Sequence, residues 1–175
     1  MASTTEALAA GEPPLIELRA MTRIFRLGDD EVHAVNGASL SIRRGEYCSI
    51  MGPSGSGKSS LLNLIALLDR PTSGQYLLNG RDVTALSDDE LAAVRNRTFG
   101  FVFQSFHLVP RLTAAQNIEL PLLLAGVASR ERTTRVRDAL AELGLTERAG
   151  HRPAELSGGQ RQRVAIARAM IMRPP

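Results

Sequence analysis

The stretch Gly52-Pro53-Ser54-Gly55-Ser56-Gly57-Lys58-Ser59 decides the fold of this 175-residue chain. It matches the pattern G-x-x-x-x-G-K-[ST] in full, between a compact apolar segment and a segment with helically spaced leucines. Glycines let the backbone wrap closely around a phosphate chain, so that successive N–H groups point inward. The helix that follows would present its first N–H groups to the same anion. The stretch therefore predicts a phosphate-binding loop between a strand and a helix.

Individual side chains of this loop carry more specific expectations. Lys58 would reach the β- and γ-phosphates of a nucleotide, and the Ser59 hydroxyl would ligate Mg²⁺. Ser60 is included in the expected nucleotide site. Lys58 is the single lysine among 21 basic residues, the other 20 being arginines. A flexible Gly/Ser turn is the alternative, but it would not need a strand before the loop and a helix after it.

The composition is that of one globular domain. With 43% hydrophobic residues the chain can bury a sizeable core. The net charge is +3, and no run of five basic residues occurs, so we expect no nucleic-acid partner. No apolar stretch approaches the roughly 18 residues that span a bilayer, and residues 1–14 lack a secretory pattern. We predict a disordered tail over 1–14, a domain over 15–175 and a cytoplasmic protein.

Periodicity and turn signals predict strands that alternate with helices. Strands are expected over 15–21, 32–42 (interrupted at Asn36-Gly37), 46–51 (with Cys48 buried), 76–78 (before a hairpin turn at Asn79-Gly80) and 99–103. Helices are expected over 58–68, 88–97 (opened by a capping box of Ser87 and Glu90), 113–145 (broken near Gly126) and 157–172. This alternation predicts an α/β fold, with a helical subdomain over about 108–172.

A second motif, Leu156-Ser157-Gly158-Gly159-Gln160, opens the last predicted helix. Ser157 would cap this helix, and the two glycines would leave its first backbone N–H groups bare. Each glycine inside a helix costs about 1 kcal/mol relative to alanine, and close approach of a ligand to the backbone would justify that cost. An ordinary capped helix start is an equally good interpretation of the residues by themselves.

The loop at 52–59 followed by the motif at 156–160 resembles the nucleotide-binding domain of ABC ATPases, from about Leu15 to the last residue. The resemblance implies a P-loop NTPase fold with a β-rich N-terminal part, a parallel-sheet core and a helical subdomain. It also implies ATP and Mg²⁺ as ligands, and an ATPase coupled to transport. In that family the loop is called Walker A and the second motif the signature. The signature of one subunit caps the γ-phosphate bound to Walker A of a second subunit in a head-to-tail dimer. Ser157, Gly158, Gly159 and Gln160 therefore join the expected nucleotide site.

Two further residues receive roles from the resemblance alone. Gln104 is similar in position to the Q-loop glutamine, which touches Mg²⁺ and the attacking water in a loop that faces the membrane subunit. Without the family, Gln104 would be interpreted as a surface glutamine after a strand. Phe25 stands where the family has an aromatic residue that stacks on adenine, and core packing is its alternative interpretation.

Three segments, 61–74, 101–110 and 117–124, resemble the lipoprotein-releasing and macrolide-exporting branch. That branch implies membrane permease partners and a peripheral location on the cytoplasmic face of the membrane. An ABC-type ATPase that acts on DNA is the less favoured alternative, because such relatives usually carry long insertions between the two motifs and this chain has none.

The family pattern continues beyond the signature helix with a strand that ends in Asp-Glu (Walker B) and with a switch histidine, for which we assign no residue here. We therefore expect the chain to be incomplete at its C-terminus, and its sheet to expose apolar faces and unpaired edges. The glutamate polarises the attacking water. A nucleotide-binding module without hydrolytic activity is thus the alternative function for these 175 residues.

Overall fold

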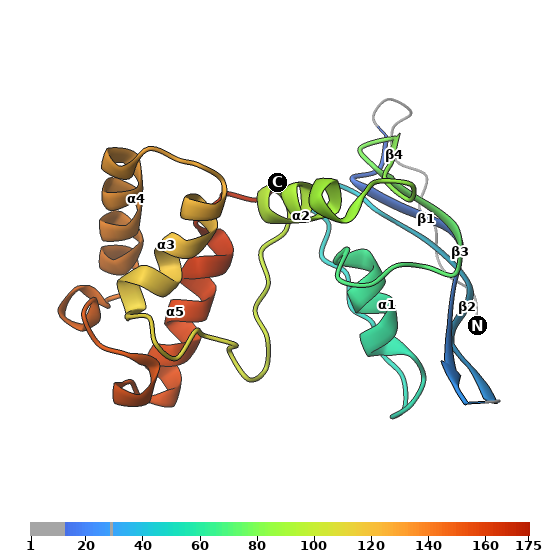
Figure 1. The fold of residues 1–175 in the computed structure, drawn as a ribbon, viewed down its shortest axis with the longest axis horizontal. Coiled ribbons are helices and arrows are strands. Elements are labelled where there is room, and N and C mark those ends of the chain that lie inside the picture. Colours follow the sequence, from blue (N-terminus) through green and yellow to red (C-terminus); the bar gives the residue numbers. More distant parts are fainter. Residues whose placement is uncertain (1–12, 29) are drawn as a thin grey trace. The chain divides into compact units, whose positions relative to one another are not determined.

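A computed structural model describes residues 13–28 and 30–175 (Figure 1). Most of the tail predicted over 1–14, residues 1–12, lies outside the described residues. The chain divides into two compact units, Met1–Leu86 and Ser87–Pro175. Each unit is described by itself below.

An antiparallel sheet forms the first unit. Its four strands are ordered β2-β1-β3-β4 and comprise β1 (Ile16–Leu27), β2 (Asp30–Ile42), β3 (Ser73–Leu78) and β4 (Arg81–Asp82). Asn79 and Gly80, at φ 50° and 75°, form the predicted hairpin turn between β3 and β4. Positive φ at both central residues matches the right-handed twist of paired strands.

The register of β1 against β2 shifts at the interruption predicted in the second strand. Met21 pairs with Ala38 and Arg23 pairs with Val35, so that Asn36 and Gly37 form an irregularity in the ladder. A second shift separates Leu18 from Met21. Such bulges bend a strand and increase its twist.

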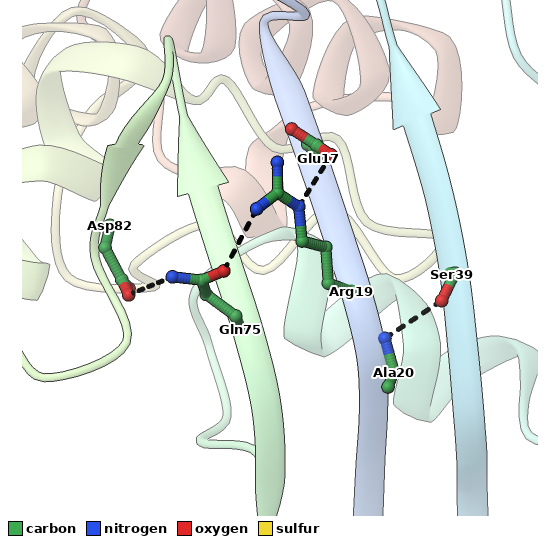
Figure 2. Close-up of polar contacts among 6 residues, drawn as sticks. All are labelled: Glu17, Arg19, Ala20, Ser39, Gln75 and Asp82. Atoms are coloured by element: carbon green, nitrogen blue, oxygen red, sulfur yellow. Dashed lines mark hydrogen bonds and ion pairs between the residues drawn. The ribbon is translucent and has the colours of Figure 1, made fainter.

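Side chains extend the bonding across this sheet. Figure 2 shows a line of polar contacts in which Arg19 binds Glu17 at 2.7 Å and Gln75 at 3.4 Å, while Gln75 donates to Asp82 at 2.7 Å. A hydrogen bond from the Gln75 amide is the largest cause that holds the pKa of Asp82 below its usual range. Hydrogen bonds from Thr84 lower this pKa further. Because Arg19 and Asp82 are exposed, solvent screening leaves these contacts with little net effect on stability.

Helix α1 (Lys58–Ile65) belongs to the first unit and is tied to the sheet through Tyr76. The Tyr76 hydroxyl donates to the Ile65 carbonyl at 2.7 Å, and its side chain is buried together with Leu18, Met21 and Leu64. Burial raises the pKa of Tyr76 well above its ordinary value. Because its phenol is both buried and bonded, Tyr76 fixes the end of α1 against β3.

The second unit is helical. Its helices are α2 (Asp88–Thr98), α3 (Ala114–Leu124), α4 (Ser129–Glu142) and α5 (Gly158–Met170), with short 3₁₀ turns η1 (Thr146–Arg148) and η2 (Pro153–Glu155). Helix α3 contacts both α4 and α5 (Figure 1). Their shared core consists of Ala114, Ile118, Leu122, Val136, Leu140, Leu145, Leu156, Val164, Ala167 and Ile171. Among the described residues, no helix is long and apolar enough to cross a membrane.

The predicted helix boundaries are confirmed within a few residues. The capping box of Ser87 and Glu90 opens α2, and an equivalent box of Ser157 and Gln160 opens α5. The predicted break near Gly126 separates α3 from α4. Helices are well predicted because caps and periodicity act within one or two turns.

Two predicted strands, 46–51 and 99–103, are wrong. Neither segment belongs to the sheet, and every strand pair in the described residues is antiparallel, so the expected parallel core sheet is not found there. A strand is held by its hydrogen-bonded neighbours, and these segments have none in the described sheet. Tyr47 and Met51 are 96% and 88% exposed, and Cys48, expected to be buried, is exposed.

Candidate nucleotide site

The predicted phosphate loop is a turn that leads directly into α1. Gly57 is the N-cap residue of α1 and adopts a left-handed conformation at φ 83°. A Cβ atom at Gly57 would lie 2.0 Å from the Ala34 carbonyl oxygen of β2. Both the conformation and the contact exclude a side chain, so β2 fixes the point at which the loop enters the helix.

The N-terminus of α1 has the donors that an anion requires. The first bond within the helix runs from the Leu61 N–H group to the Gly57 carbonyl at 2.8 Å. The N–H groups of Lys58, Ser59 and Ser60 therefore have no carbonyl in α1 to bond. Gly57 supplies no capping side chain, and the first turn contains no acidic residue. A phosphate group matches this donor set and the positive end of the helix dipole.

The Lys58 side chain folds back over the loop. Its Nζ atom donates to the Pro53 carbonyl at 2.5 Å and to the Ser56 hydroxyl at 3.4 Å. Both acceptors are uncharged, so a phosphate oxygen would be a stronger partner for the ammonium group. A Cβ atom at Gly52 would lie 2.7 Å from Ser56 Oγ, which keeps this side of the loop narrow.

The residues fit a magnesium ion that arrives with phosphate groups. Ser59 lies exposed in the first turn of α1 and offers a hydroxyl oxygen, the hard ligand that Mg²⁺ prefers. Within 13–28 and 30–175, no group of three His, Cys, Asp or Glu residues could hold a metal by itself. Mg²⁺ usually binds one or two protein ligands together with substrate phosphates, and this donor set is of that kind.

Phe25 lies on β1 opposite Val32 of β2, and its side chain is 37% exposed. The Arg23 guanidinium lies 4.5 Å from the centroid of its ring, and Arg23 also pairs with Asp69 at 2.9 Å. The alternative of core packing for Phe25 is therefore wrong. Its role as a stacking surface stays a prediction.

The signature motif forms the N-terminus of α5. Ser157 Oγ accepts from the Gln160 N–H group at 3.3 Å, and Gln160 Oε1 accepts from the Ser157 N–H group at 2.9 Å. Gly158 and Gly159 are exposed, and added Cβ atoms would meet nothing within 4 Å. The two glycines thus leave this helix end open to approach from solvent, while Leu156 anchors it in the core.

Gln104 is exposed in the loop between α2 and α3. Residues on either side of it are ordered by ring contacts, since the Phe103 and His107 rings stack at 4.5 Å between centroids. Gln104 and the signature both belong to the second unit, whereas the phosphate loop and Phe25 belong to the first.

Sequence reasoning missed three side chains that fix the Gln104 loop. Arg168 of α5 donates to the carbonyls of Phe106 and His107, and burial lowers the pKa of Arg168. Arg161 of α5 lies 5.8 Å from the centroid of the Phe106 ring. Arg161 and Arg168 are seven residues apart, about two helical turns, and this spacing in the sequence indicates that both lie on one face of the helix.

The third missed side chain is Asn117, the fully buried polar residue of α3. Its side chain accepts from the Val109 N–H group at 2.7 Å and donates to the carbonyls of Val109, Leu112 and Thr113. These bonds satisfy the amide and close the loop onto α3. An asparagine inside an otherwise apolar helical pattern was the signal for such a role.

Comparisons with known proteins point to one family. The family model described as ABC transporter matches residues 35–175. The macrolide export ATP-binding/permease protein MacB of Hyphomonas neptunium is 52% identical over 159 residues, covering 91% of this chain and 25% of that protein. The ABC transporter ATP-binding protein YknY of Bacillus subtilis is 51% identical over 160 residues, covering 91% of this chain and 70% of that protein.

A solved structure has the same fold. The dimeric ATP-binding cassette MJ0796, in a post-hydrolysis state bound to ADP and Pi, matches with a TM-score of 0.83 and 44% identity. The match covers 91% of this chain and 71% of that one. The chain spans about a quarter of the length of the macrolide export relatives that it matches.

Proposed function

The chain belongs to the ABC transporter family, and from this premise we propose that it is the ATP-binding subunit of a transporter. For the complete protein, we propose that MgATP binding and hydrolysis are coupled to export or lipoprotein release through a membrane permease. The observation that carries this proposal is the phosphate loop. It presents the first N–H groups of α1 and the Lys58 ammonium group to a nucleotide phosphate chain, and the close contact of Gly57 with β2 fixes its position.

We assign the nucleotide contacts as follows. The backbone of residues 52–57 and the N–H groups of Lys58, Ser59 and Ser60 hold the β- and γ-phosphates, and Lys58 exchanges its loop acceptors for phosphate oxygens. Ser59 would supply an oxygen to Mg²⁺, and the resemblance assigns the same role to Gln104; the ion would neutralise phosphate charge during transfer. Phe25 offers a partly exposed ring for the adenine base.

We propose that the signature acts in a second copy or a related subunit. The open N-terminus of α5, with Ser157, Gly158, Gly159 and Gln160, caps the γ-phosphate bound to the partner's loop in a head-to-tail dimer. The dimeric state of MJ0796 supports this assignment.

Permease subunits are the proposed transport partner. The macrolide export relatives are named as ATP-binding/permease proteins, which combine both parts in one protein. By analogy, the chain works at the cytoplasmic face of a membrane, held there by its permease.

For the 175 residues alone we propose ATP binding without multiple turnover. The assigned site residues include no carboxylate to polarise the attacking water. Water positioning contributes several orders of magnitude to phosphoryl transfer.

The test compares wild type and Lys58→Ala in the complete protein assembled with its membrane subunits. We expect Lys58→Ala to reduce ATP turnover by at least about 100-fold, because the phosphate chain loses its charged contact. Phosphate release is measured in parallel for the 175-residue chain, which should show none above background. Unchanged turnover in Lys58→Ala would contradict the function, and Lys58-dependent multiple turnover by the 175-residue chain would contradict its proposed inactivity.

A further inference from the structure

The segment that carries Gln104 is held in a conformation that it would not adopt by itself. Phe106 and His107 have φ values of 60° and 44°, in the left-handed region that side chains other than glycine disfavour. The His107 N–H group bonds to the Ser105 carbonyl, two residues earlier, at 2.6 Å. Such tight turns persist only where surrounding contacts hold them.

Helix α5 supplies those contacts on the C-terminal side of Gln104. Arg168 Nη1 donates to the His107 carbonyl at 2.7 Å, and Arg168 Nη2 donates to the Phe106 carbonyl at 2.8 Å. The two nitrogens of one planar guanidinium thus fix two successive carbonyls. A lysine cannot reproduce this geometry, because its charge is carried on a single nitrogen.

The same helix also holds the chain on the N-terminal side of Gln104. A Cβ atom at Gly100 would lie 2.1 Å from the Ala169 carbonyl oxygen, so the backbone there rests directly on α5. Arg161 adds a contact with the Phe106 ring. Gln104 is therefore bracketed by contacts with one helix while its own side chain stays exposed.

We propose that Arg168 is a positioning residue for Gln104, an inference that rests on the proposed function. Through Arg168, α5 joins the Gln104 loop to the signature at its own N-terminus, about 16 Å away along the helix axis. Both motifs then belong to one rigid element of the second unit. The simpler alternative is that the positive charge of Arg168 only stabilises the C-terminal end of α5 through the helix dipole.

Hydrogen exchange tests the contact without nucleotide. Arg168→Met in the 175-residue chain should raise amide exchange of Phe106 and His107 at least tenfold, while Val164 and Ala165 in the middle of α5 keep their protection. Arg168→Lys, which retains the charge at the helix end, should also raise exchange at both amides. Arg163→Lys, at an exposed position of the same helix, is the matched control and should change neither. Unchanged exchange at Phe106 and His107 in Arg168→Met would overturn the proposal.

A double-mutant cycle tests the route through Gln104. In the complete protein with its membrane subunits, Arg168→Lys should lower the kcat of ATP hydrolysis about tenfold and leave KM for ATP within twofold. In a Gln104→Ala background the same change should have no further effect, because the positioned group is gone. An equal loss in both backgrounds, or a loss in KM alone, would overturn the positioning role. The proposed function itself fails only if Lys58→Ala retains turnover, so the two failures are distinguishable.

Discussion

Gly57 is the position in the phosphate loop where a side chain is excluded both by the backbone conformation and by a neighbouring strand. Gly55 and Gly57 have similar positive φ values, 79° and 83°, but an added Cβ meets nothing at Gly55 and the Ala34 carbonyl oxygen at Gly57. An alanine would therefore meet similar backbone strain at both positions, but only at Gly57 would its Cβ atom clash with β2. This pair separates the two effects within one loop.

We expect Gly55→Ala to lower the free energy of unfolding by about 1–2 kcal/mol through strain alone. Gly57→Ala should lower it by about 3 kcal/mol or more, because β2 or the loop must also move. Urea unfolding of both variants and wild type measures the difference. Equal destabilisation would mean that the contact between Gly57 and β2 is absent in solution.

At the residue scale, the sequence alone proposes the nucleotide contacts, but it does not reveal the side chains that hold the Gln104 loop. Lys58, Ser59 and Ser157 follow from fixed spacings inside single motifs. Arg168 and Phe106 are 62 residues apart, and nothing local pairs them. Long-range contacts of this kind depend on how the helices pack, which one sequence does not state.

At the element scale, helices and strands differ in how far the sequence determines them. The capping box predicted at Ser87 and Glu90 and the helix cap predicted at Ser157 each depend on no more than four residues, and both are confirmed. The segments 46–51 and 99–103 are as apolar as strands, yet they have no partner in the described sheet. Strand formation needs a neighbour that lies elsewhere in the chain, so apolar character alone predicted these two wrongly.

Tyr76, which connects β3 to α1 through its bond to Ile65, predicts how the stability of the chain depends on pH. Because burial raises the pKa of Tyr76, the folded chain keeps the phenol protonated where the unfolded chain loses the proton. Its contribution to stability is complete below pH ~10 and falls as pH rises further, by up to about 1.4 kcal/mol per unit. Tyr76→Phe should remove this dependence, and should lower stability near neutral pH by about 1 kcal/mol through loss of the bond to Ile65.

Unfolding free energies measured between neutral pH and pH 11 check this prediction. Tyr47 is the matched control, because it is 96% exposed and Tyr47→Phe should leave the whole profile unchanged. A profile in which Tyr76→Phe retains the alkaline slope would place the cause elsewhere.

At the scale of the whole molecule, the two units contribute different parts of one proposed reaction. The first unit carries the phosphate loop, and the second carries Gln104 and the signature. The resemblance predicted the cassette fold correctly, and the solved cassette confirms it. Among the described residues every strand pair is antiparallel, so the expected parallel pairing is not found there.

Equilibrium binding of ATP and AMP to the 175-residue chain, in the presence of Mg²⁺, tests the central claim most directly. A loop that holds β- and γ-phosphates should bind ATP at least tenfold more tightly than AMP, and Lys58→Ala should remove most of that difference. Arg81→Ala, which removes an exposed positive charge from β4, is the control and should leave the difference intact. Equal affinity for ATP and AMP in wild type, or a preference for ATP that survives Lys58→Ala, would contradict the assignment of residues 52–60 as the nucleotide site.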